Sequence, residues 1–168
     1  YSLFLRMLLS VIGSGHLGSI HARLLAQNPD VTLVGVVDPD STKGSAVALE
    51  HGAQWYPDVA SMPDVDAVVI AAPTLLHHSL AIDCLNRGFH CFIEKPVTAT
   101  YAEAQDLMQR AAATDRLIQV GHVERFNPAI RALSGYNVSP LFIEAHRLAP
   151  FKPRAIDVSV IHDLMIHD

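Results

Sequence analysis

The stretch Val11-Ile12-Gly13-Ser14-Gly15-His16-Leu17-Gly18 decides the fold of this chain. It ends the apolar run Met7–Ile12 and opens a segment in which apolar residues recur at helical spacing. A strand, a glycine-rich turn and a helix in this order form the G-x-G-x-x-G fingerprint of dinucleotide binding. Gly13 permits the tight turn, Gly15 lets a pyrophosphate approach the backbone, and Gly18 lets the helix pack close to the strand. The unpaired N–H groups of the helix then point at the phosphates.

A second marker supports this interpretation, because the glycine pattern alone also fits an ordinary strand–turn–helix with three incidental glycines. The apolar run Val31–Val37 is typical of a buried strand, and it ends in Asp38. A carboxylate about 20 residues after the last glycine is where an acceptor for the ribose 2′-hydroxyl is expected. Pro39 and Asp40 follow, with no arginine to neutralise a 2′-phosphate. The two markers together predict NAD binding, with NAD preferred over NADP.

The composition is that of a globular α/β protein. The 168 residues can bury the core of one domain or slightly more, since half of them are apolar and only 17% are charged. A net charge of −5 gives no electrostatic basis for binding nucleic acid or an anionic membrane. Cys84 and Cys91 lack the spacing of metal ligands and favour a reducing, cytoplasmic location over a disulfide framework. We expect no metal site, because no H-E-x-x-H motif or Cys/His cluster occurs among the ten histidines.

The apolar N-terminus is not expected to be a signal peptide. Residues 1–12 have no basic leader, and their apolar run leads directly into the glycine turn without room for a cleavage site. The run is also too short to span a bilayer.

Strands and helices are predicted to alternate along the chain. The strands are expected at 7–12, 31–37, 54–56, 67–72, 89–93 and 117–120. The intervening helices are expected across the apolar stripe Leu17–Leu25, from a cap at residue 41 or 42 to about Glu50, and at about 75–87 and 101–113. Ser41 or Thr42 is the expected cap of the second helix. This alternation predicts parallel βαβ units in a doubly wound sheet.

Chemistry-bearing residues follow the predicted strands. In doubly wound sheets, ligands bind at the carboxyl ends of the strands. The residues expected at those ends are Gly13–Gly18, Asp38, Pro73-Thr74, Glu94-Lys95-Pro96 and Gly121-His122. The sequence therefore predicts one ligand site along this edge.

The pattern changes after Gly121, where we place a domain boundary between residues 1–121 and 122–168. A short helix is expected at Arg125–Leu133, with Pro128 in its first turn. Pro140–Leu148 alternates like a strand with one solvated face. Asp157–Asp168 carries a helical apolar stripe. These elements are interpreted as the beginning of a second domain that the chain does not complete.

The motifs together resemble the Gfo/Idh/MocA oxidoreductases. The resemblance rests on Gly13–Gly18 with Asp38, Ala72-Pro73-Thr74-Leu75-Leu76-His77, Glu94-Lys95-Pro96, Arg125-Phe126-Asn127-Pro128 and Asp163-Leu164-Met165-Ile166-His167. It implies a Rossmann domain followed by a second α/β domain with an open sheet, which carries the substrate site and often the oligomer contact. Within the family, the stretches after Gly121 and after Asp163 look most like those of nucleotide-sugar 3-dehydrogenases.

The resemblance also implies a function and a set of site residues. The implied activity is NAD-dependent oxidation of a secondary hydroxyl of a sugar, C3 of a UDP-N-acetyl sugar, by an enzyme that is a homo-oligomer at full length. The implied catalytic residues are Lys95, Asp163 and His167. The implied cofactor-binding residues are Gly13, Ser14, Gly15, His16, Leu17, Gly18, Asp38, Ala72, Pro73, Thr74, His77, Glu94 and Lys95.

Simpler explanations remain open for several of these residues. Lys95 is also compatible with a solvated lysine at a strand end, and His167 with a satisfied helix histidine. Thr74 as a helix cap and His77 as an exposed side chain would suffice structurally. For the whole chain, the alternatives are an inositol or free-sugar dehydrogenase and a non-catalytic dinucleotide-binding module. Lys95, Asp163 and His167 together favour an enzyme, because a binding module has no need of them.

Overall fold

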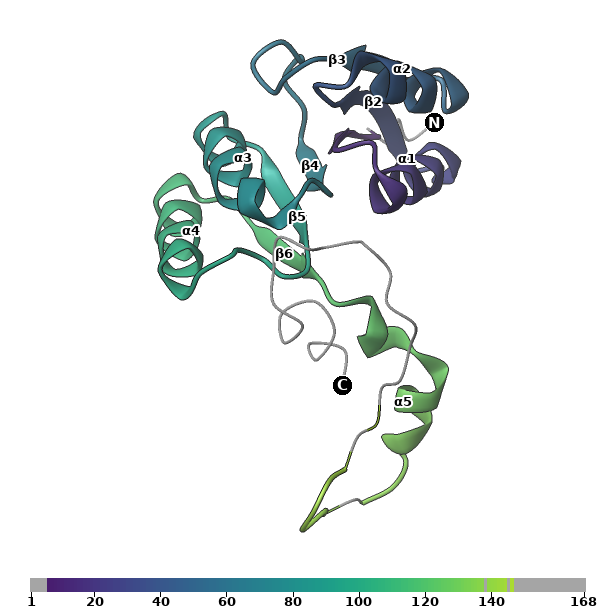
Figure 1. The fold of residues 1–168 in the computed structure, drawn as a ribbon, viewed down its shortest axis with the longest axis vertical. Helices are drawn as coiled ribbons and strands as arrows, with labels where there is room; N and C mark the ends of the chain where they lie inside the picture. The colour runs from purple at the N-terminus through teal and green to yellow at the C-terminus, as the bar shows by residue number, and fades with distance from the viewer. Residues whose placement is uncertain (1–5, 138, 145, 147–168) are drawn as a thin grey trace, which may run out of the picture.

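A six-stranded parallel sheet forms the centre of the computed structural model, which describes residues 6–137, 139–144 and 146. Helices lie against both faces of the sheet (Figure 1). The elements are β1 (Met7–Ile12), α1 (His16–Gln27), β2 (Val31–Val37), α2 (Ser41–Glu50), β3 (Gln54–Tyr56), β4 (Ala67–Ile70), α3 (Thr74–Asn86), β5 (His90–Glu94), α4 (Tyr101–Thr114), β6 (Ile118–Gly121), a 3₁₀ turn η1 (Val123–Phe126) and α5 (Pro128–Leu133). Across these described residues, no helix has the length and apolarity that a bilayer-spanning segment needs.

The strand order β3-β2-β1-β4-β5-β6 confirms the doubly wound Rossmann fold. Ile12 lies beside Val37 on one side and Ile70 on the other, and Ile70 lies beside Ile93. Because the carboxyl ends of four strands are level, the residues that follow them begin at one edge of the sheet. The strand order reverses between β1 and β4, which is the position where such sheets bind their ligands.

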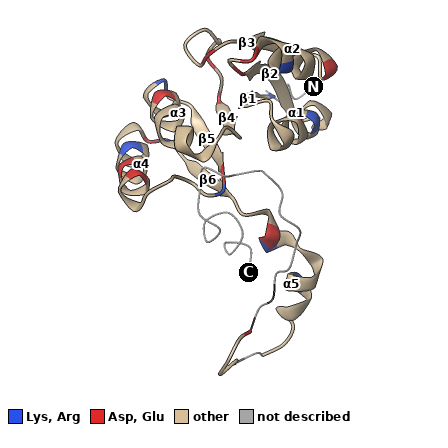
Figure 2. Ribbon diagram, viewed as in Figure 1, with Lys and Arg blue, Asp and Glu red and all other residues tan. Residues whose placement is uncertain are grey.

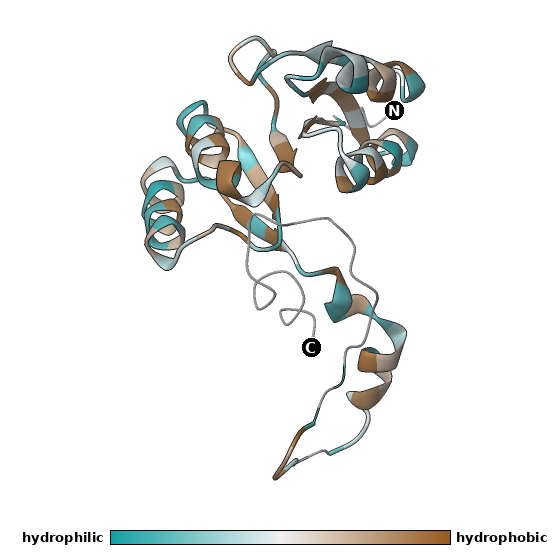
Figure 3. Cartoon of the chain, viewed as in Figure 1, coloured by the Kyte–Doolittle hydropathy of each residue, from teal (hydrophilic) through white to brown (hydrophobic). Residues whose placement is uncertain are grey.

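Alternation along the strands builds a core on each face of the sheet. Val11 and Val69 pack with Ala22 of α1, whereas their chain neighbours Ile12 and Ile70 pack on the opposite face. The second face is covered by α3 and α4, whose buried residues include Ala81, Cys84, Leu85 and Leu107. Figure 3 shows hydrophobic residues along the strands and hydrophilic ones on the outer turns of the helices. Charged residues are scattered over the helices and connecting loops (Figure 2).

Helix boundaries differ in detail from the sequence prediction. The cap of α2 is Asp40, not Ser41 or Thr42: its carboxylate accepts hydrogen bonds from the backbone N–H groups of Thr42 and Lys43, both at 3.1 Å. Asp40 is the better cap because its charge also interacts favourably with the positive end of the helix.

The region after Gly121 departs further from prediction. The expected helix at 125–133 is divided into η1 and α5, and Pro128 is the first residue of α5. The division has a local cause, because the Asn127 side chain accepts a hydrogen bond from the N–H of Ala129 at 3.0 Å and starts a new helix. The expected strand at 140–148 is absent from its described part, residues 140–144 and 146. None of the described strands pairs with this segment, and alternation without a partner strand does not form a sheet. The expected helix at 157–168 lies outside the described residues.

Both cysteines are free thiols buried between α3 and β5. A hydrogen bond with Cys91 and burial together raise the pKa of the Cys84 thiol. Neither property suits a reactive nucleophile, so these side chains act as small core residues.

Candidate functional site

The three glycines form a cradle after β1. Gly13 adopts φ +98° and donates its N–H to the carbonyl of Val37 at 2.8 Å, which turns the chain out of the sheet. A Cβ on Gly18 would lie 1.8 Å from the carbonyl oxygen of Gly13, so only glycine allows α1 to pack this close. A Cβ on Gly15 would meet no atom within 4 Å, and the space in front of it is open. The cradle fits a pyrophosphate, which needs this close approach to the backbone.

The N-terminus of α1 completes the cradle. The helix begins at His16, and its cap residue Gly15 provides no side-chain hydrogen bond. Gly15, His16 and Leu17 are exposed. No side chain of the cap residue therefore bonds to the first N–H groups of α1. The positive end of the helix faces the open space in front of Gly15. This arrangement suits an anionic group.

Asp38 is held against the glycine turn. Its Oδ2 accepts hydrogen bonds from the backbone N–H of Ser14 at 2.7 Å and from the Ser14 hydroxyl at 2.6 Å. Its Oδ1 accepts the N–H of Asp40 at 2.8 Å, and its carbonyl accepts the indole N–H of Trp55 at 2.9 Å. A carboxylate offers about four acceptor positions, so one remains for a ribose hydroxyl.

The turn after β4 is tied to the turn after β5 by His77. This side chain is only 1% exposed, with Nε2 at 2.8 Å from the carbonyl oxygen of Ala72 and Nδ1 at 2.9 Å from that of Pro96. The exposed position considered for His77 is therefore wrong. Thr74 does not cap α3 either, because Pro73 occupies the cap position without a side-chain hydrogen bond and Thr74 is the first helical residue.

Glu94 ends β5 and Lys95 follows it, joined to Pro96 by a cis peptide bond. Glu94 Oε1 lies 2.7 Å from Nε2 of His21 on α1, and Glu94 Oε2 accepts the N–H of Lys95 at 3.3 Å. Burial raises the pKa of the Glu94 carboxyl group, but the hydrogen bond and charge interaction with His21, together with the backbone N–H and the charge of Lys95, lower it by more, so that the pKa lies below its ordinary value. Sequence reasoning missed His21, since no spacing signal relates a helix histidine to a carboxylate 73 residues away.

The structure thus brings most of the predicted residues to one edge of the sheet. Direct contacts join Ser14 to Asp38, Ala72 to His77, and His77 to Pro96. Asp163 and His167 lie outside the described residues. Within the described part of the chain, no group of three His, Cys, Asp or Glu side chains has an arrangement that could hold a metal ion.

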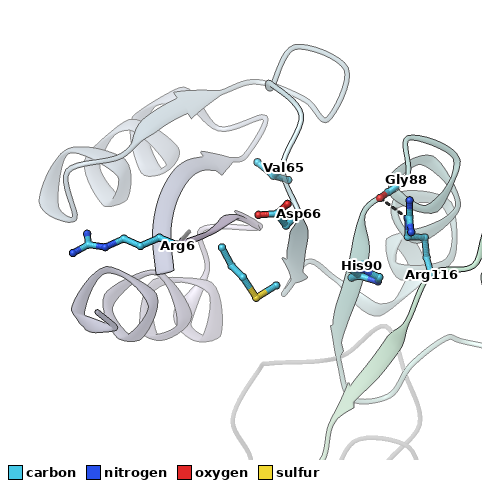
Figure 4. A pocket seen from close by; sticks show the side chains of 7 residues that line it. Arg6, Val65, Asp66, Gly88, His90 and Arg116 are labelled. Carbon is cyan, nitrogen blue, oxygen red and sulfur yellow. Dashed lines mark hydrogen bonds between the residues drawn. The ribbon is translucent and has the colours of Figure 1, made fainter. Parts of the chain in front are cut away.

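A separate cavity of about 480 Å³ opens at the opposite edge of the sheet, and Figure 4 shows the side chains that line it. Its lining includes Met7, Asp66 and His90, which lie at or next to the amino ends of β1, β4 and β5. None of the predicted site residues lines this cavity.

Comparison with known proteins gives consistent results. Residues 7–122 match the Gfo/Idh/MocA family, described as "Oxidoreductase family, NAD-binding Rossmann fold". The chain is 42% identical over 167 residues to UDP-N-acetylglucosamine 3-dehydrogenase of Acidithiobacillus ferrooxidans, covering 98% of this chain and 52% of that relative. A solved structure of the same enzyme matches with a TM-score of 0.88 and 41% identity, over 96% of this chain and 52% of the other.

Matches of lower identity include an inositol dehydrogenase and a protein of antibiotic biosynthesis. The chain is 36% identical over 125 residues to scyllo-inositol 2-dehydrogenase (NAD(+)) of Bacillus subtilis, covering 71% of this chain and 36% of the relative. The structure of GenD2 from gentamicin A biosynthesis, in complex with NAD, matches with a TM-score of 0.73 and 28% identity, over 77% of this chain and 38% of the other. The chain spans about half the length, or less, of these relatives.

Proposed function

This chain belongs to the Gfo/Idh/MocA oxidoreductase family with its NAD-binding Rossmann fold, and from that premise we propose that it serves the oxidation of a nucleotide sugar. The proposed reaction removes hydride from a secondary hydroxyl carbon, C3 of a UDP-N-acetyl sugar. The observation that carries the proposal is the Glu94-Lys95-Pro96 turn, which leaves β5 at the same edge as the glycine cradle. The similarity to UDP-N-acetylglucosamine 3-dehydrogenase over nearly the whole chain supports this choice of substrate.

Each residue of the proposed site is assigned a role in binding the cofactor or in the reaction. Bound NAD supplies the hydride-accepting nicotinamide. The cradle Gly13–Gly18 with Ser14, His16 and Leu17 would hold the pyrophosphate, Asp38 the adenosine ribose, and the turn residues Ala72, Pro73, Thr74 and Glu94 the nicotinamide side, with His77 behind them. Lys95 would hydrogen-bond the substrate oxygen, His167 would take its proton, and Asp163 would orient substrate or partners. Residues 122–168 would begin the second, substrate-binding domain.

We expect the protein to bind NAD more tightly than NADP. Asp38 would accept hydrogen bonds from the ribose but repel a 2′-phosphate. Replacing Asp38 by asparagine keeps an acceptor for Ser14 and removes the charge. It should reduce the preference for NAD by at least about tenfold, or about 1.4 kcal/mol. Fluorescence titration with NADH and NADPH measures both affinities.

Asp30 provides the control for this change, because it lies before β2, at the opposite end of that strand, and is exposed. Asp30→Asn alters the net charge equally and should leave the preference unchanged. Tighter binding of NADPH than of NADH by the parent protein would contradict the assignment of Asp38.

The substrate proposal predicts a selective reaction in a small panel. Full-length protein is incubated with NAD and either UDP-N-acetylglucosamine, UDP-N-acetylglucosaminuronic acid, myo-inositol, scyllo-inositol or free N-acetylglucosamine, and NADH fluorescence is followed. We expect NADH only with the UDP sugars, because the nucleotide supplies binding energy that a free sugar lacks. Preferential oxidation of an inositol would favour the second family activity, suggested by the scyllo-inositol relative. Tight NADH binding without turnover of any compound would favour a non-catalytic module.

A further inference from the structure

Two histidines form hydrogen bonds with the residues on either side of Lys95. His21 reaches Glu94 from α1 at 2.7 Å, and His77 reaches the carbonyl oxygen of Pro96 from α3 at 2.9 Å. The two helices pack on opposite faces of the sheet, as their buried residues belong to different core clusters. The residues directly before and after Lys95 are therefore each held by a hydrogen bond from a different helix.

The contact between His21 and Glu94 is built into the packing of the sheet. The side chains are only 21% and 13% exposed. The His21 ring also packs edge-on against Phe92, with ring centroids 5.4 Å apart and an interplanar angle of 63°. On the other side, a Cβ on Gly121 of β6 would come within 3.1 Å of the Glu94 carboxyl group. Glu94 is confined by α1 on one side and β6 on the other, and its two oxygens point at His21 and at the N–H of Lys95.

This contact links two parts of the site that are distant in sequence. His21 lies on α1 three residues after Gly18, between one and two turns from the helix N-terminus that would hold the pyrophosphate. Glu94 is the residue directly before Lys95 and the last residue of β5. A shift of α1 on binding the cofactor would therefore be transmitted to the lysine turn through one hydrogen bond. Without His21, the Glu94 carboxylate would be released beside the lysine with nothing on α1 to hold it.

We propose that His21 is a positioning residue for Lys95, which through Glu94 sets the lysine turn relative to the helix of the pyrophosphate cradle. The role assigned to Lys95 rests on the proposed function. The contact between His21 and Glu94 does not rest on the proposed function, because it connects the cofactor cradle with the lysine turn whatever the substrate is.

Two variants of His21 separate positioning from packing. His21→Phe keeps the aromatic contact with Phe92 and removes the hydrogen bond, whereas His21→Gln keeps an N–H that can reach Glu94. Because a displacement of about 1 Å at a reacting group costs about a hundredfold in rate, we expect His21→Phe to lower kcat by about 10–100-fold. The affinity for NADH should change by less than about threefold, which is under 0.7 kcal/mol. The kcat of His21→Gln should be close to that of the parent. The kcat of Glu94→Gln, which retains an acceptor, should lie between those of His21→Phe and His21→Gln.

His78 is the matched control, because it is also a histidine with Nε2 at 2.7 Å from a carboxylate, Asp106 on α4, but lies outside the site. His78→Gln should leave kcat and NADH affinity unchanged. A rate for His21→Phe within about threefold of the parent, or equal losses in His21→Phe and His21→Gln, would overturn the proposal.

A second measurement needs no sugar substrate. The lysines of the protein, which include Lys43, Lys95 and Lys152, are labelled by ¹³C-dimethylation, and Lys95→Arg identifies the signal of Lys95. NADH should shift the Lys95 signal in the parent and by a similar amount in His21→Gln, and the size of this shift should differ clearly in His21→Phe under saturating NADH. An unaltered shift in His21→Phe would refute the coupling. If the shift follows this pattern but no UDP sugar is oxidised, the positioning role of His21 is supported and the proposed substrate is wrong.

Discussion

Replacing Lys95 by alanine is expected to lower kcat for oxidation of the sugar by at least about 10²–10⁴-fold. In the proposed site, the lysine hydrogen-bonds the substrate oxygen and stabilises the negative charge that develops on it. His167 removes the proton from the same oxygen, and a general base typically contributes about 10²–10⁴-fold, or about 3–5 kcal/mol of barrier. We expect the lysine to contribute at least as much, because its removal takes a positive charge from the place where negative charge develops.

Steady-state kinetics of Lys95→Ala and His167→Asn, alongside NADH titration, test this assignment. His167→Asn should lose the rate with nearly unchanged NADH affinity, since its role is to hold a proton rather than the cofactor. Histidine suits that role because its unperturbed pKa lies near neutral pH. If His167→Asn retains turnover within a few-fold of the parent, the proton route is wrong and Lys95 becomes the first candidate for the base.

The parts of the site that could be predicted are those encoded by local spacing. The glycine turn, the carboxylate about 20 residues later and the apolar strands are short-range patterns, each with one structural solution. The alternation of strands and helices predicts that the glycine turn and Asp38 lie at the same edge of the sheet, as they do, but not that Asp38 accepts a hydrogen bond from Ser14. The alternation alone does not determine the order of the six strands, because doubly wound sheets with the same alternation occur in more than one strand order.

The side of a helix on which a single residue lies was harder to predict. His77 and His78 are neighbours on α3, yet the first is 1% exposed and the second forms a surface pair with Asp106. Helix α3 is apolar on several sides, because it packs on the sheet and also against α4. Periodicity therefore gave no single polar face, and the buried carbonyl oxygens that attract His77 belong to turns formed elsewhere in the chain.

Contacts between distant elements were beyond prediction for a related reason. The pairing of His21 with Glu94 depends on how α1 lies across the sheet, which is set by the contact of Gly18 with Gly13 and by the register of β4 and β5. The segment predicted as a strand at 140–148 shows a different limit: its described part, residues 140–144 and 146, forms no strand, because an alternating pattern also requires a partner strand.

The largest loss of stability is expected for Gly18→Ala. The new Cβ would lie 1.8 Å from the carbonyl oxygen of Gly13 and 2.8 Å from its carbonyl carbon, and neither atom can move by rotating a side chain. Either α1 must lift from β1 or the Gly13 turn must open, and Gly13 is itself confined against the backbone of Ala71. Adding a methyl group to a packed core typically costs about 1–3 kcal/mol. We expect more than about 4 kcal/mol here, a large part of the about 5–15 kcal/mol of a typical domain.

Gly15→Ala separates this packing role from cofactor binding within the same turn. Its Cβ would meet no protein atom within 4 Å, and Gly15 has φ −66°, which alanine adopts readily. Urea denaturation should therefore place Gly15→Ala within about 1 kcal/mol of the parent, the remaining cost being that of alanine at a helix cap. Its NADH affinity should nevertheless fall, because the methyl group enters the space where the pyrophosphate approaches the backbone. Stability of Gly18→Ala within about 1 kcal/mol of the parent would show that the turn can relax, and that close packing of α1 is not what requires glycine at this position.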